Sequence, residues 1–226
     1  WPAPPAQDFD ALLLTSANGV RAFARLGHEV RFITPVEAGV DGVEVLSPPG
    51  RRSGTLGEAR FLLGYYRLIR DCPADLVHVH YAASLGAWLA LMARPDVPLA
   101  VSTMGGDIMD EEQMVLPRTA RWMTYQVLKR ADLVTAKTDH MMGRLSEIGI
   151  PTERAVKNPW GVDLERFRPR PERNAAMAEA LGIEARHRVI MSPRLLRPFY
   201  NADIVFRALP AVLEREPNAR LVVLEH

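Results

Sequence analysis

The sequence predicts an α/β fold, in which a doubly wound parallel sheet carries helices on both faces and is followed by a partial second βαβ unit. Short apolar runs of strand length recur along the chain, and segments with helical period separate them. Such apolar runs suit strands that are buried on both faces of a parallel sheet. Strands and helices alternate, and this order is typical of parallel sheets with crossover helices.

The chain opens with a predicted βαβ unit. The apolar run at residues 9–15 predicts a strand, and residues 20–26 predict a short helix with its apolar side chains on one side. Gly27 then lies where a helix C-cap glycine is expected. Residues 29–34 and 43–46 predict the next two strands, because both runs are mainly apolar and short.

Further strands and helices are predicted as far as residue 157. The helices are expected at residues 56–71, 82–93, 117–130 and 139–148, and the strands at residues 76–79, 99–102, 133–136 and 155–157. Pro73 ends the first of these helices, and Pro117 suits the first turn of the third. Gly149 is expected to cap the fourth helix.

The domain organisation follows from these elements and from composition. We expect an extended lead-in at residues 1–8, an N-terminal domain at 9–167, a linker with a helix at 168–187, a partial second domain at 188–223 and a remnant of an affinity tag at 224–226. The second domain is predicted to contain strands at residues 188–192 and 220–223 around a helix at 202–214. A unit of about 40 residues buries too little surface to fold alone.

Composition excludes several classes of protein. The net charge of +1 argues against nucleic acid as a partner. The single cysteine, Cys72, forms no internal disulfide, which predicts a reducing, cytoplasmic location. No apolar run approaches about 18 residues, so no stable membrane insertion is expected. The mildly basic helix that carries Trp122 and Tyr125 is compatible with contact with an anionic membrane, although the favoured interpretation is an ordinary helix packed in the domain.

Five segments carry a resemblance to a known family. They are Gly-His-Glu-Val at residues 27–30, Asp-Leu-Val-His-Val-His at 75–80, Thr-Met-Gly-Gly-Asp at 103–107, Asn-Pro-Trp-Gly-Val-Asp at 158–163, and Ser-Pro-Arg at 192–194 followed by Tyr-Asn-Ala-Asp at 200–203. In this order they resemble the retaining glycosyltransferases of family 4, which have the GT-B fold. The resemblance covers residues 27–223. It implies a Rossmann-like N-terminal domain that binds an acceptor and a second domain that binds a nucleotide-sugar, which is a substrate rather than a cofactor.

The first 26 residues resemble a different family. Residues 9–26, FDALLLTSANGVRAFARL, are similar to a segment of uroporphyrinogen-III synthases. Two interpretations remain: an engineered chimera, which is favoured, or a natural transferase with an unusual first loop. The predicted function is accordingly that of a glycosyltransferase derivative, truncated or recombined and inactive, and the alternative is an engineered chimera without catalytic activity.

Candidate site residues follow from the edge of the sheet where parallel strands end, because ligands bind there. The acceptor-site candidates are Asn18, Gly19, His80, Gly105, Gly106, Asp107 and Lys137. Glycines let backbone N–H groups approach a ligand, and the alternative is a tight turn that needs a positive φ. Met104 stands where many relatives carry a histidine, and a methionine cannot exchange a proton.

The donor-binding candidates are Arg194 and Asn201. Arg194 matches the diphosphate-binding arginine of the family, but the lysine that commonly follows it is missing and the family's donor-binding glutamates would lie beyond residue 226. We therefore expect weak donor binding. If one of the two predicted domains were incomplete, the other would expose the apolar surface of the cleft between them. Such exposed surface predicts a homo-oligomer or a domain-swapped dimer.

No metal site is predicted. The chain has no Cys/His spacing typical of zinc sites. His78 and His80 are expected to point to opposite faces of their strand and so not to converge on one ion. Hydrogen-bonded, packed histidines are the favoured interpretation.

Overall fold

The structure is a computed structural model of the 226-residue chain. It describes residues 12–14, 24, 27–35, 39–40, 43–48, 54–94, 96–109, 117–159, 161, 164–165, 167–169, 174–193, 196 and 200–223. The chain divides into two units, residues 1–161 and 162–226. The domain boundaries that the sequence predicts place this division after residue 167, and they stay a prediction.

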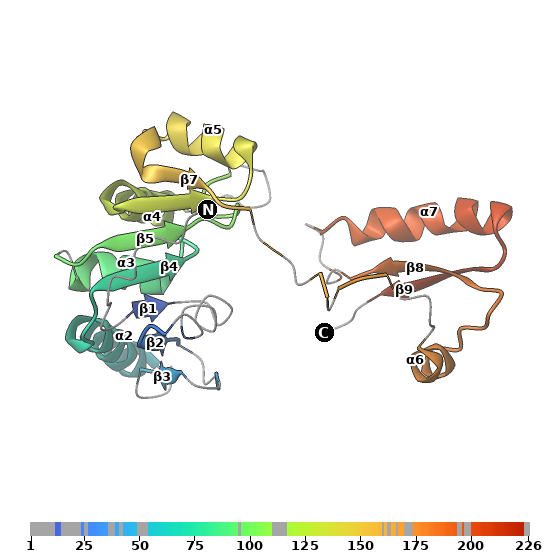
Figure 1. Ribbon diagram of the computed structural model, residues 1–226, viewed down its shortest axis with the longest axis horizontal. Helices are drawn as coiled ribbons and strands as arrows, with labels where there is room; N and C mark the ends of the chain where they lie inside the picture. The colour runs from blue at the N-terminus through green and yellow to red at the C-terminus, as the bar shows by residue number, and fades with distance from the viewer. Residues whose placement is uncertain are drawn as a thin grey trace. The chain divides into compact units, whose positions relative to one another are not determined.

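Unit 1 is built on a parallel sheet, as predicted (Figure 1). Its described strands are β1 (Leu12–Leu14), β2 (Val30–Ile33), β3 (Glu44–Leu46), β4 (Leu76–His80), β5 (Leu99–Ser102), β6 (Leu133–Ala136) and β7 (Ala155–Lys157). Their order is β3-β2-β1-β4-β5-β6-β7, and every described pair is parallel. The order reverses between β1 and β4, which is where open α/β sheets bind ligands.

Helices connect these strands. They are α2 (Gly54–Asp71), α3 (Leu85–Ala93), α4 (Arg118–Arg130) and α5 (Asp139–Glu147), with a 3₁₀ turn at Thr152–Arg154. Helix α3 begins three residues after the predicted start, because the Ser84 side chain caps it by accepting a hydrogen bond from Ala87 N. Gly149, with φ of 84°, ends α5 as expected. The helix predicted at residues 20–26 lies outside the described residues, except for Ala24.

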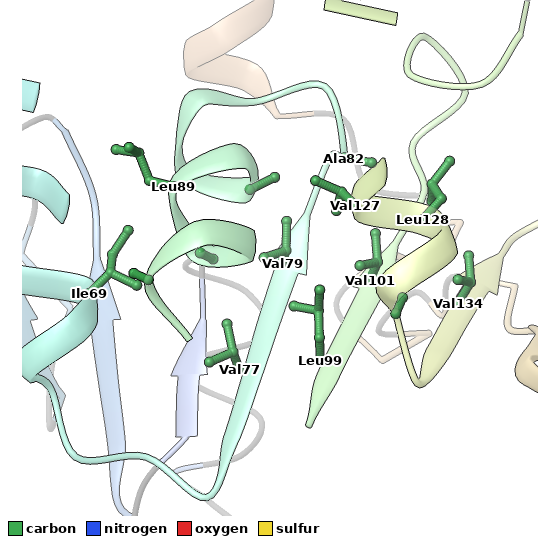
Figure 2. Close-up of a cluster of buried hydrophobic side chains, with 14 of the residues drawn as sticks. Ile69, Val77, Val79, Ala82, Leu89, Leu99, Val101, Val127, Leu128 and Val134 are labelled. Carbon is green, nitrogen blue, oxygen red and sulfur yellow. The ribbon is translucent and has the colours of Figure 1, made fainter. Parts of the chain in front are cut away.

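The main core lies between the sheet and α2, α3 and α4, which pack in sequence along one face. Figure 2 shows Val77 and Val79 of β4 and Val101 of β5 directed toward these helices. Each is at most 2% exposed, and burying such a side chain contributes roughly 1.5–3 kcal/mol. A smaller cluster around Val30 and Phe32 lies on the other face. Alternation therefore sends His78, which lies between Val77 and Val79, to the face without the main core.

Unit 2 contains the predicted second βαβ unit. Strand β8 (Arg188–Ser192) pairs in parallel with β9 (Ala219–Val223), and α7 (Ala202–Arg215) connects them. A short helix, α6 (Ala175–Ala180), precedes them. Apolar side chains of β8 are exposed, including Met191 at 62%. Within the described residues of unit 2, α7 leaves much of the β8–β9 ribbon uncovered, and a two-stranded ribbon is marginally stable by itself.

Candidate functional site

The candidate site lies where β4, β5 and β6 end. These strands are neighbours in one parallel sheet, so the segments that follow them meet at the same edge (Figure 1). His80, the Gly105–Gly106–Asp107 segment and Lys137 belong to these segments, and the structure thus brings them to one edge of unit 1. The remaining acceptor candidates, Asn18 and Gly19, lie outside the described residues, as does the donor candidate Arg194.

Asp107 ties two of these segments together. Its Oδ2 accepts a hydrogen bond from Ala82 N at 2.9 Å, and its Oδ1 accepts from Met104 N and Gly105 N, each at 3.0 Å. The side chain is almost fully buried. The carboxylate therefore holds the turn after β4 against the turn after β5, and both of its oxygens are occupied by backbone amides.

Burial is the main influence on the ionisation of Asp107 and of its neighbour Tyr81. It raises the pKa of Asp107, while hydrogen bonds from the backbone amides of Ala82, Met104 and Gly105, and the residue's own amide, act in the opposite direction. Burial also raises the pKa of the Tyr81 phenol, and the nearby Asp107 carboxylate raises it further. Tyr81 consequently keeps its proton at neutral pH and offers a neutral hydroxyl.

The Gly105–Gly106 segment forms a tight turn. Gly105 has φ of 111°, a conformation that residues with a side chain rarely adopt, and its carbonyl accepts hydrogen bonds from Ile108 N and Met109 N. The N–H of Gly105 points to Asp107 rather than outward. Arg144 of α5 supports this turn from outside, because its Nε donates to Ile108 O at 2.9 Å. For Gly105 the geometry favours the tight-turn alternative.

Tyr81 has a left-handed backbone, with φ of 72°, which is costly for a bulky aromatic residue. Its N–H still donates to Ser102 O of β5 at 3.0 Å, and the left-handed backbone ends the strand at this point. Sequence reasoning did not select Tyr81 as a site residue. Its position after the His-Val-His strand end was the only signal in the sequence.

The two histidines of β4 lie on the same face, and the expectation that they point to opposite faces was wrong. Residues two apart in a strand point the same way, because side chains alternate with a period of two. The rings of His78 and His80 are 4.5 Å apart between centroids. No group of three or more His, Cys, Asp or Glu side chains suited to a metal occurs among the residues that the structure describes.

His78 takes part in a polar row across three strands. Its Nε2 lies 2.9 Å from Ser102 Oγ, and Thr135 Oγ1 donates to the same Ser102 oxygen at 2.9 Å. Burial lowers the pKa of His78 to about 3, and the neighbouring His80 contributes. Burial also lowers the pKa of His80. Both imidazoles are thus neutral at physiological pH, and His78 fits this row as a hydrogen-bond acceptor.

Lys137 directly follows β6 and is half-buried. The next residue, Thr138, caps α5 by accepting a hydrogen bond from Met141 N at 3.2 Å. Beside this cap, Lys157 at the end of β7 forms an ion pair with Asp139 at 2.8 Å. Asp139 compensates the charge of Lys157, so the edge after β6 offers the half-buried Lys137 beside a helix N-terminus, an arrangement that favours negatively charged groups.

A cavity of about 540 Å³ lies elsewhere in unit 1. It is lined by Arg31, Glu44, Leu46, Gly64, Arg67, Leu68, Asp71, Cys72 and Pro73. Arg31 donates to Glu44 Oε2 at 2.8 Å and to Pro73 O at 3.2 Å, so the main cation at this cavity is held within the protein. Residues 71–73 precede β4, which places the cavity toward the edge where strands begin. We therefore locate the candidate site at the opposite edge.

In unit 2, Asn201 adopts a left-handed conformation, with φ of 54°, and begins α7. Its side chain makes no capping hydrogen bond to the helix. Asn is among the few residues that tolerate this conformation, which gives Asn201 a local structural role. Its assignment to donor binding stays a prediction.

Comparison with known proteins identifies the family. The glycosyl transferase 4-like domain matches residues 15–161. A D-inositol 3-phosphate glycosyltransferase from Nocardia farcinica is 31% identical over 173 residues, covering 74% of this chain and 36% of that protein. A GDP-mannose-dependent α-(1-6)-phosphatidylinositol monomannoside mannosyltransferase from Mycolicibacterium smegmatis is 28% identical over 158 residues, covering 70% of this chain and 40% of that protein. The chain thus spans about two-fifths of the length of these relatives.

Solved structures show the same fold. The structure of Anabaena Alr3699/HepE in complex with UDP and glucose aligns with a TM-score of 0.70 at 17% identity, over 95% of this chain and 60% of that one. Sucrose-phosphate synthase from Thermosynechococcus elongatus aligns with a TM-score of 0.65 at 15% identity, over 95% and 62%. At such identities the likeness concerns the fold alone.

The comparisons give no support to an engineered chimera. The family match starts at residue 15, so it includes much of the segment that was compared with uroporphyrinogen-III synthases. The parallel sheet continues through β1, which pairs with both β2 and β4. The chain belongs to the family of glycosyl transferase 4-like domains.

Proposed function

We propose that the protein to which this chain belongs transfers a sugar from a nucleotide-sugar donor to an acceptor hydroxyl, and that unit 1 binds the acceptor where β4, β5 and β6 end. The observation that carries this proposal is the family match, whose residues 15–161 include every described segment of the candidate site. Unit 2 contributes to the donor side, with Arg194 and Asn201 as candidates by motif.

The geometry supports this assignment in two ways. Loss of a nucleoside diphosphate develops negative charge, which cations and helix N-termini stabilise. Lys137 and the N-terminus of α5 provide both at the candidate edge. Both imidazoles are neutral and supply no positive charge; His78 already accepts from Ser102, which leaves His80 as the histidine to accept a hydrogen bond from an acceptor hydroxyl. No metal is needed in this scheme.

The choice of substrates follows the names of the relatives. The two relatives described above act on inositol phosphate and on a phosphatidylinositol mannoside, and one of them uses GDP-mannose. A solved neighbour holds UDP and glucose. We therefore place inositol-containing acceptors first, with UDP-glucose and GDP-mannose as donors.

The experiment is a transfer assay with each donor and inositol 3-phosphate, in the presence of EDTA. Replacing Lys137 by Ala is expected to reduce kcat/KM by at least about tenfold, the effect of losing about 1.4 kcal/mol of transition-state stabilisation. The matched control is Lys129→Ala, because Lys129 is the last-turn lysine of α4 at the far edge of the sheet. Equal activity of the two variants would contradict the assignment of Lys137.

A second candidate is a transferase-derived fold without activity. It is favoured by Met104, which stands where the family resemblance leads us to expect a histidine and which cannot exchange a proton. This candidate predicts no product with any donor and no heat of binding for UDP or GDP-mannose. Measurable binding of either nucleotide, or turnover, would reject it.

A further inference from the structure

The outer side of α4 carries an unusual combination of side chains. The helix contains four basic residues and no acidic one, in the sequence RTARWMTYQVLKR. Trp122 is 60% exposed, although tryptophan is normally well covered. Arg118 and Lys129 are exposed as well. At 3.6 residues per turn these three side chains lie within about 40° of one another around the helix, so they form one stripe.

The neighbouring helix adds apolar surface. Every side chain of α3, LGAWLALMA, is apolar, although the helix lies in the outer layer of the unit. Leu85, Trp88 and Leu91 are only half-buried, and Met92 is 53% exposed. Helices α3 and α4 pack against each other. A helix that is apolar on all sides is ordinarily covered on all sides, so the solvent side of α3 is atypical for a water-facing surface.

We propose that the outer side of α3 and α4 docks on an anionic lipid bilayer, with Trp122 in the headgroup region and with Arg118 and Lys129 bound to lipid phosphates. This combination of an interfacial indole, exposed cations and an apolar helix is the pattern of surface-bound rather than spanning segments. No helix within the described residues is long and apolar enough to cross a membrane. The proposal does not depend on the proposed function.

Charge complementarity selects this occupant. The cations of the stripe flank an indole, whereas a nucleic-acid surface requires a broad basic field, which a chain of net charge +1 lacks. The position of the stripe is also suitable. Helix α4 follows β5 and begins at the edge where the strands end, so Arg118 lies at the end of unit 1 that carries the candidate site. Docking through this stripe would bring lipid surface to that edge.

The test is sedimentation of the 226-residue chain with vesicles of phosphatidylcholine and phosphatidylglycerol, compared with pure phosphatidylcholine. Binding to the anionic vesicles is expected, and it should weaken as salt rises. The double variant Arg118→Gln/Lys129→Gln should bind about 30-fold more weakly, because each cation near an anionic surface contributes roughly a factor of five. Trp122→Ala should lose about tenfold, which corresponds to roughly 60 Å² of apolar area leaving water.

Matched controls come from unit 2. Arg186→Gln/Arg188→Gln removes two exposed cations, and Met177→Ala removes an apolar side chain with 57% exposure. Both controls should bind vesicles as the parent chain does. Trp122→Phe is expected to reduce the quenching of protein fluorescence by brominated lipid relative to the parent chain, and this difference separates Trp122 from the other three tryptophans. Absence of binding to anionic vesicles, or equal losses in controls and stripe variants, would overturn the proposal, as would stronger binding to heparin or DNA than to vesicles.

Discussion

Replacing Asp107 by Ala tests whether the carboxylate holds the candidate site together. The substitution removes the acceptor of three backbone amides, those of Ala82, Met104 and Gly105. The side chain is 3% exposed, so water does not readily take its place. The two turns that it connects are expected to separate, and the loss should appear in stability and in local order alike.

The magnitude follows from the three hydrogen bonds. Leaving a buried amide without a partner costs about 1–3 kcal/mol, so three amides give roughly 3–6 kcal/mol after partial relaxation. Burial raises the pKa of Asp107, which means that the charged form is itself penalised, and removing that charge returns part of this cost. We expect a net destabilisation of about 3 kcal/mol, or a fall in Tm of roughly 6–12 °C for a domain of this size.

Urea unfolding followed by circular dichroism measures this change, with amide hydrogen exchange at Ala82 and Gly105 as the local readout. The control is Asp139→Ala, whose carboxylate is 86% exposed and bonded to Lys157, and which should change stability by less than about 1 kcal/mol. If Asp107→Ala unfolds at the same urea concentration as the parent, the carboxylate does not connect the two turns and the account of the site fails.

Three further predictions follow from other features. The pKa of His78 is lowered from 6.5 to about 3, so between these pH values the unfolded chain binds a proton that the folded chain does not. The free energy of unfolding therefore falls as pH drops from about 6.5 towards 3. His78→Gln should flatten this part of the stability profile, measured by urea unfolding at successive pH values. A Cβ at Gly86 would lie 2.6 Å from Tyr65 Oη, so Gly86→Ala should cost about 1–3 kcal/mol, and a double-mutant cycle with Tyr65→Phe should recover most of it; additive losses would argue against this contact. The exposed apolar side of β8 predicts self-association of the 226-residue chain, which Met191→Lys should reduce; sedimentation equilibrium that shows a monomer at high concentration would contradict this expectation.

The sequence was informative where apolar runs had clear ends. The predicted bounds of β5, β6 and β7 agree with the structure, because each run is short, apolar and bounded by polar or turn residues. Bounds were less accurate where a side chain made the cap. Helix α3 starts at Leu85 because Ser84 accepts a hydrogen bond from the helix, and this contact depends on a rotamer that residue order alone does not specify.

The site was harder to predict for physical reasons. The edge of the sheet followed from parallel topology, but the role of Asp107 required knowing that Ala82 lies within 2.9 Å of it, although the two are 25 residues apart. The left-handed backbone of Tyr81 could not be predicted from the residue type, because tyrosine normally avoids this conformation. The misplacement of His78 and His80 was an error in applying strand periodicity, and a correct count from residue 76 would have put both on one face.

The bridge formed by Asp107 also restricts how this edge can be re-engineered. If the loop after β4 were replaced by that of a relative, its backbone amide would be positioned for the partner in that relative. The loop after β5 would still present the Asp107 carboxylate in the position that suits Ala82 N. Both segments would have to be transplanted as a pair. Libraries that randomise one of them separately should consequently yield mostly poorly folded clones, whereas libraries that vary both around a fixed aspartate should retain foldable variants.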